Sequence, residues 1–406
     1  MPLSMRMGLR NLARQPRRTV LTGLMLVVGT ALAVWMNGIS QGTYAIFIDG
    51  ATRGMLGHFQ LLNGDFNEKP TLFKTIDDAE RLLDAMSRVP GVQGVTARVE
   101  TAGLVALGNR TVGVGLLGVD PVREERTTKL RSMVKRGRWL PPHREASAGE
   151  PLPIILGSGV AKRLEADLGS EVSFVGQAAD GSIAAELFQV EGILDSDSSE
   201  LDGALVLVRL SDAQEVLSLG ERVHRLIGTV HSTGELAEVF QQLPRPKEYR
   251  LASWVELNPG LADSIEADRD SGQIMLWVVM LMAVLGVANA MLMSIFERTR
   301  EIGIMRALGT SRRQVSSIVL WEVAWLASAG IAVGTGVGAA LTSWLVIPLP
   351  EPVDFGGVSF DAVTGAHTAF GTLWTPLLIF GACLLAGLWP AQRAARLNPL
   401  AALRMS

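Results

Sequence analysis

The chain has 406 residues, of which 48% are hydrophobic and only 19% are charged, and its mean hydropathy is +0.28. This composition indicates a membrane protein rather than a series of soluble domains. The net charge of −3, without a basic patch outside the flanks of the apolar runs, argues against a nucleic-acid partner. The single cysteine, Cys383, excludes an intramolecular disulfide.

The N-terminal region predicts an amphipathic helix followed by a membrane span. Within residues 1–18, Met5 and Leu9 share one helical face while Arg6 and Arg10 share the other, which suits a helix in the cytoplasmic membrane interface. The alternative is a basic flank that only fixes topology. Residues 19–48 carry no charge and are long enough for transmembrane helix 1, which would leave the N-terminus in the cytoplasm.

Residues 49–270 have an ordinary soluble composition and predict a large mixed α/β domain outside the cytoplasm. Apolar alternation and helical spacing predict strands at 58–62, 95–107 and 111–119 and a helix at 76–89. A smaller strand-rich subdomain, 138–221, is expected as an insertion into an α/β unit formed by 49–137 and 222–260. Four acidic residues could bind a divalent ion, although an exposed turn is favoured: Asp195, Asp197, Glu200 and Asp202.

A charged segment, 297–313, separates two uncharged runs that predict transmembrane helix 2 (271–296) and transmembrane helix 3 (314–347). Its five arginines and two glutamates place it in the cytoplasm. Residues 297–308 favour a helix, Gly309 is placed to end it, and Ser311 with Gln314 forms a capping-box pattern that starts the next helix.

The third span carries two features that affect helix packing. Gly330, Gly334 and Gly338 recur every four residues, so a neighbouring helix can approach closely, either as ordinary packing or as a moving interface. Glu322 lies near the cytoplasmic end, where an acid could form a functional site, although we expect it to reach the interface or to pair with an arginine. A short periplasmic loop, 348–367, precedes transmembrane helix 4 (368–392).

The last residues, 393–406, form a cytoplasmic tail that contains Arg393, Arg396 and Arg404. The expected fold is therefore a membrane α-helical protein with four spans, arranged one plus three, and an α/β domain inserted after the first span. The sequence has no phosphate-binding loop, no His-Glu-x-x-His and no G-x-S-x-G motif. We expect neither an enzyme nor a metal site, and no ATP bound by this chain.

The arrangement resembles the FtsX-like permeases, which include the macrolide-exporter (MacB) type and the lipoprotein-releasing (LolC/LolE) type of ABC transporter. Residues 297–315 are similar to the family's segment between its second and third spans. Less specific similarities lie at 153–157, 161–164, 168–172 and 389–404. The resemblance implies a multi-pass permease of the bacterial inner membrane that pairs with a second permease, either a copy of itself or a homologue.

The resemblance also implies mechanotransmission, in which separate cytoplasmic ATPase subunits, carrying ATP and Mg, drive motion of the periplasmic domain. The ATPase-coupling residues would be charged residues for contact and glycines for shape: Glu297, Arg298, Glu301, Gly303, Arg306, Gly309, Arg312 and Arg313. The alternative is that these charges only fix topology.

The expected function within this family is release of lipoproteins to a periplasmic carrier, with the lipid anchor entering between the first and second spans. The interfacial N-terminal helix and the separate ATPase favour that type. The Met-rich second span could adapt to acyl chains or could simply pack. Two alternatives remain: MacB-like efflux of a small molecule or peptide, and FtsX-like regulation of a cell-wall hydrolase without transport.

Overall fold

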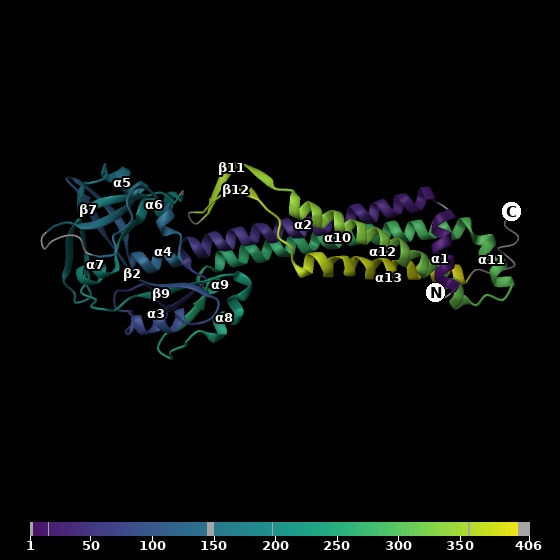
Figure 1. Ribbon diagram of the computed structural model, residues 1–406, viewed down its shortest axis with the longest axis horizontal. Helices are drawn as coiled ribbons and strands as arrows, with labels where there is room; N and C mark the ends of the chain where they lie inside the picture. Colours follow the sequence, from purple (N-terminus) through teal and green to yellow (C-terminus); the bar gives the residue numbers. More distant parts are fainter. Residues whose placement is uncertain (1–2, 15, 144–149, 197, 356–357, 397–406) are drawn as a thin grey trace. The chain divides into compact units, whose positions relative to one another are not determined.

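The computed structural model describes residues 3–14, 16–143, 150–196, 198–355 and 358–396 (Figure 1). The chain divides into two compact units. The helical unit comprises Met1–Tyr44, Ser264–Pro348 and Ala362–Ser406, and the α/β unit comprises Ala45–Asp263 and Leu349–Asp361. The α/β unit is thus built mainly from the chain that lies between two long helices.

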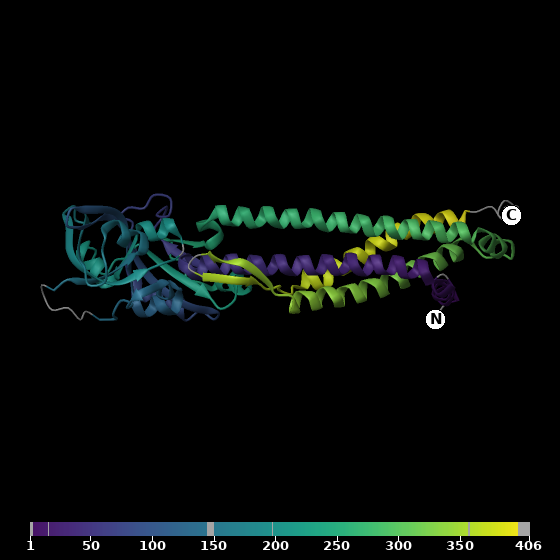
Figure 2. The same ribbon diagram turned by 90° about the horizontal axis from the view of Figure 1, so that it is seen from above.

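Among the described residues, four helices are long and apolar enough to cross a membrane. They run lengthwise beside one another in Figures 1 and 2, and they account for the four apolar runs of the sequence. The helical elements are α1 (Leu3–Arg14), α2 (Pro16–Ala51), the π-helical turn η1 (Thr52–Leu56), α10 (Pro259–Glu297), α11 (Thr299–Ala307), α12 (Arg312–Trp344), the π-helical turn η4 (Phe370–Trp374) and α13 (Thr375–Ala395).

The four long helices share one apolar core. Leu26 of α2, Val287 of α10 and Val323 of α12 are buried in it, together with Ile379 and Cys383 of α13. Cys383 is therefore a packing residue, enclosed by apolar side chains.

Helices α2 and α12 pack with their backbones close together. A Cβ atom added at Gly334 would lie 2.7 Å from the carbonyl oxygen of Val27, and one added at Gly338 would lie 2.7 Å from that of Ala31. Gly330 lies against Leu26 in the same way. The glycine stripe of α12 therefore faces α2, where only small residues fit.

The α/β unit contains a ten-stranded sheet within the part of the chain that the structure describes, in the order β10-β1-β9-β2-β3-β8-β5-β7-β4, with β6 pairing β2 and β7. The strands are β1 (Phe59–Leu62), β2 (Val92–Leu107), β3 (Arg110–Val119), β4 (Val134–Gly137), β5 (Leu152–Gly157), β6 (Glu171–Gln177), β7 (Ile183–Leu194), β8 (Leu205–Arg209), β9 (Arg225–Val230) and β10 (Arg250–Ser253). The pairs β3–β8 and β5–β7 are parallel.

Short helices connect these strands. They are α3 (Ala79–Ser87), α4 (Pro121–Thr127), η2 (Leu130–Met133), α5 (Ser158–Leu164), α6 (Ser199–Ala204), α7 (Leu210–Val216), η3 (Thr233–Glu235), α8 (Leu236–Gln242) and α9 (Trp254–Leu257). Strand β8 shows how the sheet is covered: Val206 and Val208 join the larger apolar core, while Leu205 and Leu207 join a smaller one. Because successive side chains point to opposite faces, both faces of β8 are buried.

The strands of the predicted insertion, 138–221, belong to the same sheet as the rest of the unit. Strand β2 is long enough to pair with β9 through Val92–Arg98 and with β6 through Gly103–Ala106. Strand β8 continues the sheet by pairing with β3. The predicted boundaries at 138 and 221 therefore do not interrupt the hydrogen-bonded sheet.

Two local predictions are corrected by the structure. The stretch 348–367, predicted as a loop, contains a two-stranded sheet of β11 (Ile347–Phe355) and β12 (Val358–Val363). The prolines of this stretch are compatible with strands, because proline is tolerated on edge strands and a two-stranded sheet has only edges. The helix predicted at 76–89 begins at Ala79 because Asp78 adopts a left-handed conformation and Ile76 bridges Val223.

A buried ion pair lies inside the α/β unit. Arg98 donates from Nη2 to Glu124 Oε1 at 2.6 Å and from Nε to Oε2 at 3.2 Å, and both side chains are almost completely inaccessible to solvent. Thr128 donates to the same carboxylate, and Arg98 also donates to the carbonyl oxygen of Met55. The bidentate geometry satisfies charges that would be costly to bury alone.

We expect Glu124→Gln to destabilise the α/β unit by about 3–5 kcal/mol, because it leaves the Arg98 guanidinium buried without an anion. Unfolding of the full chain in detergent, followed with increasing denaturant, measures this loss. Arg123→Gln is the matched control, since Arg123 bridges the exposed carboxylate of Glu80 and should cost less than about 1 kcal/mol. Equal effects of the two variants would contradict the importance of the buried pair.

Candidate functional site

One end of the helical unit turns the chain back on itself through α11. Its last turn is closed by hydrogen bonds from Gly309 N to the carbonyl oxygen of Arg306 (3.2 Å) and from Thr310 N to that of Met305 (3.0 Å). Gly309 has a φ of 96°, which explains the need for glycine. Ser311 and Gln314 then form the reciprocal capping box that starts α12, with distances of 2.8 and 3.3 Å. The stop at Gly309 and the capping box of Ser311 and Gln314, both predicted from the sequence, are therefore present in the structure.

A buried carboxylate joins three helices beside this turn. Glu322 of α12 is only 3% exposed. Its carboxylate lies 3.5 Å from Nη1 of Arg298 and 4.0 Å from Nη2 of Arg18, and Ser294 donates to it at 3.4 Å. We call Arg18, Ser294, Arg298 and Glu322 the Glu322 network. As expected from the sequence, the acid of the third span pairs with arginine.

More exposed ion pairs surround the network. Arg18 also contacts Glu297 at 3.2 Å, and Arg298 contacts Glu301 at 3.2 Å. Arg14 reaches Glu301 from α1 at 3.8 Å. Each of these surface pairs contributes little by itself. Together they connect α1 and α2 with the segment that contains α11.

Helix α1 covers the network from the side. A Cβ atom added at Gly8 would lie 3.0 Å from the backbone nitrogen of Glu322 and 3.1 Å from Cβ of Trp321. This close approach requires glycine and places α1 directly on the turn of α12 that carries the buried acid. The amphipathic N-terminal helix is thus part of the packing at this end.

The predicted coupling residues fall into two groups. Glu297, Arg298 and Glu301 form ion pairs with other parts of the helical unit. Arg306 donates to the carbonyl oxygen of Thr310 at 3.1 Å and is partly buried, while Gly303 is buried where α11 packs. In contrast, Gly309, Arg312 and Arg313 are exposed, and neither arginine has an ion pair with any described residue.

Sequence reasoning missed the exposed apolar side chains of this segment. Leu308 is 82% exposed and Ile304 is 44% exposed, and they lie four residues apart on the same helical face. Ile302 and Met305 fill the opposite, inward face. The signal was present in the sequence: α11 has apolar residues on two faces, although one face is enough for packing.

A second feature of the helical unit is a groove of about 1250 Å³ between α2 and α10. Its lining is mostly apolar and includes Leu24, Val28, Met282, Leu285 and Met293. Further along the same helices, toward Tyr44, lies a cavity of about 360 Å³ that is partly lined by polar side chains, including Ser40, Gln41 and Gln273. The α2–α10 seam is therefore open, unlike the tight α2–α12 contact.

The acidic cluster suggested by the sequence does not form a metal site in the described structure. Asp202 is buried, not in an exposed turn as expected, and accepts hydrogen bonds from Ser196 N (2.9 Å) and Oγ (2.7 Å). Burial raises the pKa of Asp202 above its ordinary value. Asp197 lies outside the described residues. Within these residues no group of three or more His, Cys, Asp or Glu side chains is placed to hold a metal.

Two family models match the chain. Residues 19–245 match the MacB-like periplasmic core domain, and residues 273–399 match the C-terminal region of the FtsX-like permeases. The periplasmic region of MacB from Actinobacillus actinomycetemcomitans aligns with 53% of this chain and 95% of its own, at 17% identity and a TM-score of 0.36.

Among the similar proteins, the lipoprotein-releasing system transmembrane protein LolC of Neisseria meningitidis is 23% identical over 98% of both chains. The uncharacterized ABC transporter permease YknZ of Bacillus subtilis is 24% identical and covers 99% of this chain and 98% of its own. The macrolide export protein MacB of Nitrobacter winogradskyi is 26% identical over 97% of this chain, which spans 58% of that longer protein.

These relatives are permease components of ABC transporters, and the four apolar helices fit a multi-pass protein of the inner membrane. The sequence matches cover both the segment of the α/β unit and the last three long helices. The chain therefore belongs to the FtsX-like permeases of ABC transporters and carries a MacB-like periplasmic core domain.

Proposed function

We propose that this permease is driven by separate cytoplasmic ATPase subunits, which bind ATP and Mg, and that it transmits their motion to its periplasmic domain. The arginines near both chain ends and beside α11 favour a cytoplasmic location for that end of the helical unit. Both termini would then be cytoplasmic, with one span before the periplasmic domain and three after it. A second permease, identical or homologous, would complete the transporter.

The observation that supports ATPase docking at α11 is the exposed pair Ile304 and Leu308. A leucine that is 82% exposed, with an isoleucine on the same face, offers apolar area to a protein partner. The start of α11 is anchored through its N-cap residue, Arg298, to Glu322. Movement of a docked partner would therefore pass directly into α10 and α12. In this proposal the predicted residue Arg298 transmits force through Glu322, while Leu308 makes the contact.

We expect Leu308→Asp to weaken binding of the ATPase encoded beside the permease by about 30-fold, which corresponds to loss of a contact worth about 2 kcal/mol. Binding of the purified ATPase is measured to the purified permease, which is embedded in nanodiscs. Leu345→Asp provides the control, because Leu345 is an exposed leucine that follows the opposite end of α12. ATPase affinity that is unchanged by Leu308→Asp would rule out this face as the docking site.

The Glu322 network should be required for coupling rather than for docking. Glu322→Gln leaves Arg298 and Arg18 without their buried anion, so we expect fewer cargo molecules released per ATP hydrolysed and a lower unfolding temperature. Glu301→Gln removes another carboxylate from the same Arg298, but Glu301 is 55% exposed and should have little effect. If the two variants behave alike in both assays, the network does not transmit motion.

The substrate that we propose is a lipoprotein, released from the inner membrane to a periplasmic carrier. The apolar groove between α2 and α10 can accept acyl chains, and its flexible lining includes Met282 and Met293. The partly polar cavity farther along these helices suits the junction between lipid and peptide. MacB-like export of a small molecule or peptide is the alternative, because relatives of both kinds have similar identity to this chain.

Reconstitution in liposomes tests this choice of substrate. We expect ATP-dependent transfer of acylated cargo to a soluble carrier, no transfer of the same cargo without acyl chains, and about tenfold slower transfer for Val28→Trp, a barrier change of about 1.4 kcal/mol. Val28 lines the groove, whereas Val20, which is similarly exposed on α2, does not, so Val20→Trp is the control. Equal transport of the acylated and the unacylated cargo would favour MacB-like export. Activation of a cell-wall hydrolase without any transfer of cargo would favour an FtsX-like regulator.

A further inference from the structure

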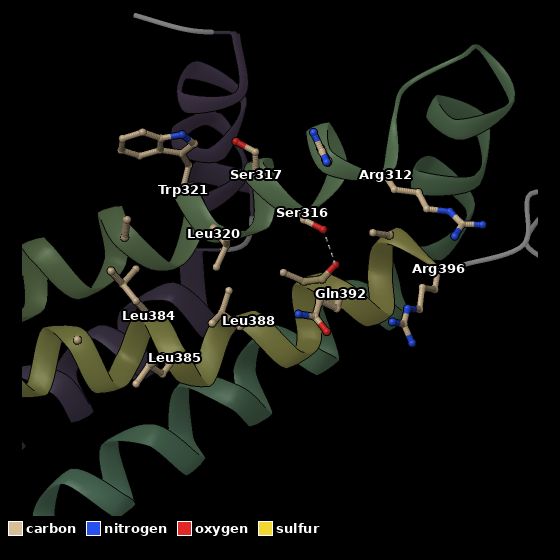
Figure 3. A pocket seen from close by; sticks show the side chains of 15 residues that line it. Arg312, Ser316, Ser317, Leu320, Trp321, Leu384, Leu385, Leu388, Gln392 and Arg396 are labelled. Carbon is tan, nitrogen blue, oxygen red and sulfur yellow. Dashed lines mark hydrogen bonds between the residues drawn. The ribbon is translucent and has the colours of Figure 1, made fainter.

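A separate groove lies between α12 and α13, at the ends that carry Arg312 and Arg396 (Figure 3). It has a volume of about 1010 Å³. Its length is lined by leucines from both helices, among them Leu320, Leu384 and Leu388. Because both helices are apolar enough to span a membrane, this lining would face acyl chains rather than water.

The mouth of the groove is strongly basic. Arg312 begins α12, and Arg396 directly follows α13, and Figure 3 shows both side chains at the same end of the groove, beyond Gln392. Arg313 lies on the rim as well. No ion pair joins any of these three arginines to another described residue, whereas nearby Arg18 and Arg298 are neutralised by carboxylates.

Polar groups line the space between the arginines and the leucines. Gln392 lines it, and so does Ser316, whose hydroxyl donates to the carbonyl oxygen of Ala391 at 3.3 Å and retains lone pairs that can accept. From its mouth inward, the groove thus passes from cationic to polar to apolar. A molecule with an anionic head, a polar middle and long apolar chains has the complementary order.

We propose that the groove between α12 and α13 binds an anionic glycerophospholipid, with its phosphate between Arg312 and Arg396 and one acyl chain along Leu320, Leu384 and Leu388. Arginines at the membrane surface attract anionic lipids, and an adjacent apolar cleft holds the chain that a soluble anion lacks. The proposal requires only that α12 and α13 span the membrane. It does not depend on ATPase docking or on the transported substrate.

Such a lipid would be placed to affect the turn between α11 and α12. Arg312 lies three residues after Gly309, the left-handed residue that follows α11, and Ser316 connects the first turns of α12 to α13. A phosphate bound by Arg312 and Arg396 would link the two helices in the same region. We therefore infer that anionic lipid stabilises the position of α11 relative to α13.

The experiment uses the full-length permease purified alone, so that contact of the same arginines with an ATPase cannot affect the result. Native mass spectrometry measures the binding of phosphatidylglycerol and, in parallel, phosphatidylcholine. We expect the wild-type permease to bind phosphatidylglycerol more tightly than phosphatidylcholine. The double variant Arg312→Gln/Arg396→Gln should lose about 30-fold in affinity, because each surface arginine contributes about a factor of five.

A matched double variant, Arg10→Gln/Arg300→Gln, removes two other exposed arginines of the helical unit that do not line the groove. It should retain wild-type affinity. An equal loss of phosphatidylglycerol affinity in both double variants would mean that binding depends only on the overall charge of the protein. This result would rule out the groove as a specific lipid site.

The groove itself is tested by Gly381→Leu, which fills it without removing charge. A Cβ atom added at Gly381 meets no atom within 4 Å, so the variant should fold. Gly336→Leu is the control, since Gly336 on α12 is equally open and does not line the groove. We expect only Gly381→Leu to lower phosphatidylglycerol affinity. Unchanged lipid binding, or a change in oligomeric state instead, would overturn the proposal.

Discussion

Burial of the Glu322 carboxylate is the constraint on which the helical unit depends. A carboxylate inside a helix bundle is stable as an anion only if cations reach it. Arg18 reaches it from α2 and Arg298 from the junction of α10 and α11. The positions of three helices at this end are therefore fixed by one charge. Because α1 packs on the backbone of Glu322, displacement of any of these elements would disturb the same carboxylate.

The two sides of α2 differ in how tightly they pack. Toward α12, glycines bring the backbones into contact, so these helices should behave as a rigid pair. Toward α10, long and flexible side chains line an open groove, including Met25, which also rests on Gly286. The chain enters the larger segment of the α/β unit through α2 and leaves it through α10. The loosely packed seam therefore lies between the two helices that flank this segment.

The sequence predicted best what local chemistry determines. The charge-free runs, the stop at Gly309 and the capping box of Ser311 and Gln314 all depend on residues close in the chain. The sequence also suggested that Glu322 would pair with an arginine, but the choice of Arg298 and Arg18 depends on helix packing over long sequence separations. For the same reason it could not show that β2 joins β9 and β6 in one sheet.

The exposed Leu308 illustrates why the candidate site was only partly predictable. The family resemblance suggested that the charges of residues 297–313 would contact a partner, and charged residues are usually solvent-exposed. The structure differs because the buried Glu322 pairs with Arg298, whose side chain therefore points into the bundle. Arg298 also forms an ion pair with Glu301. The exposed Ile304 and Leu308 then lie on the outward face of the segment together with the exposed Arg300. One carboxylate thus determines which side chains of the segment stabilise the bundle and which remain available outside it.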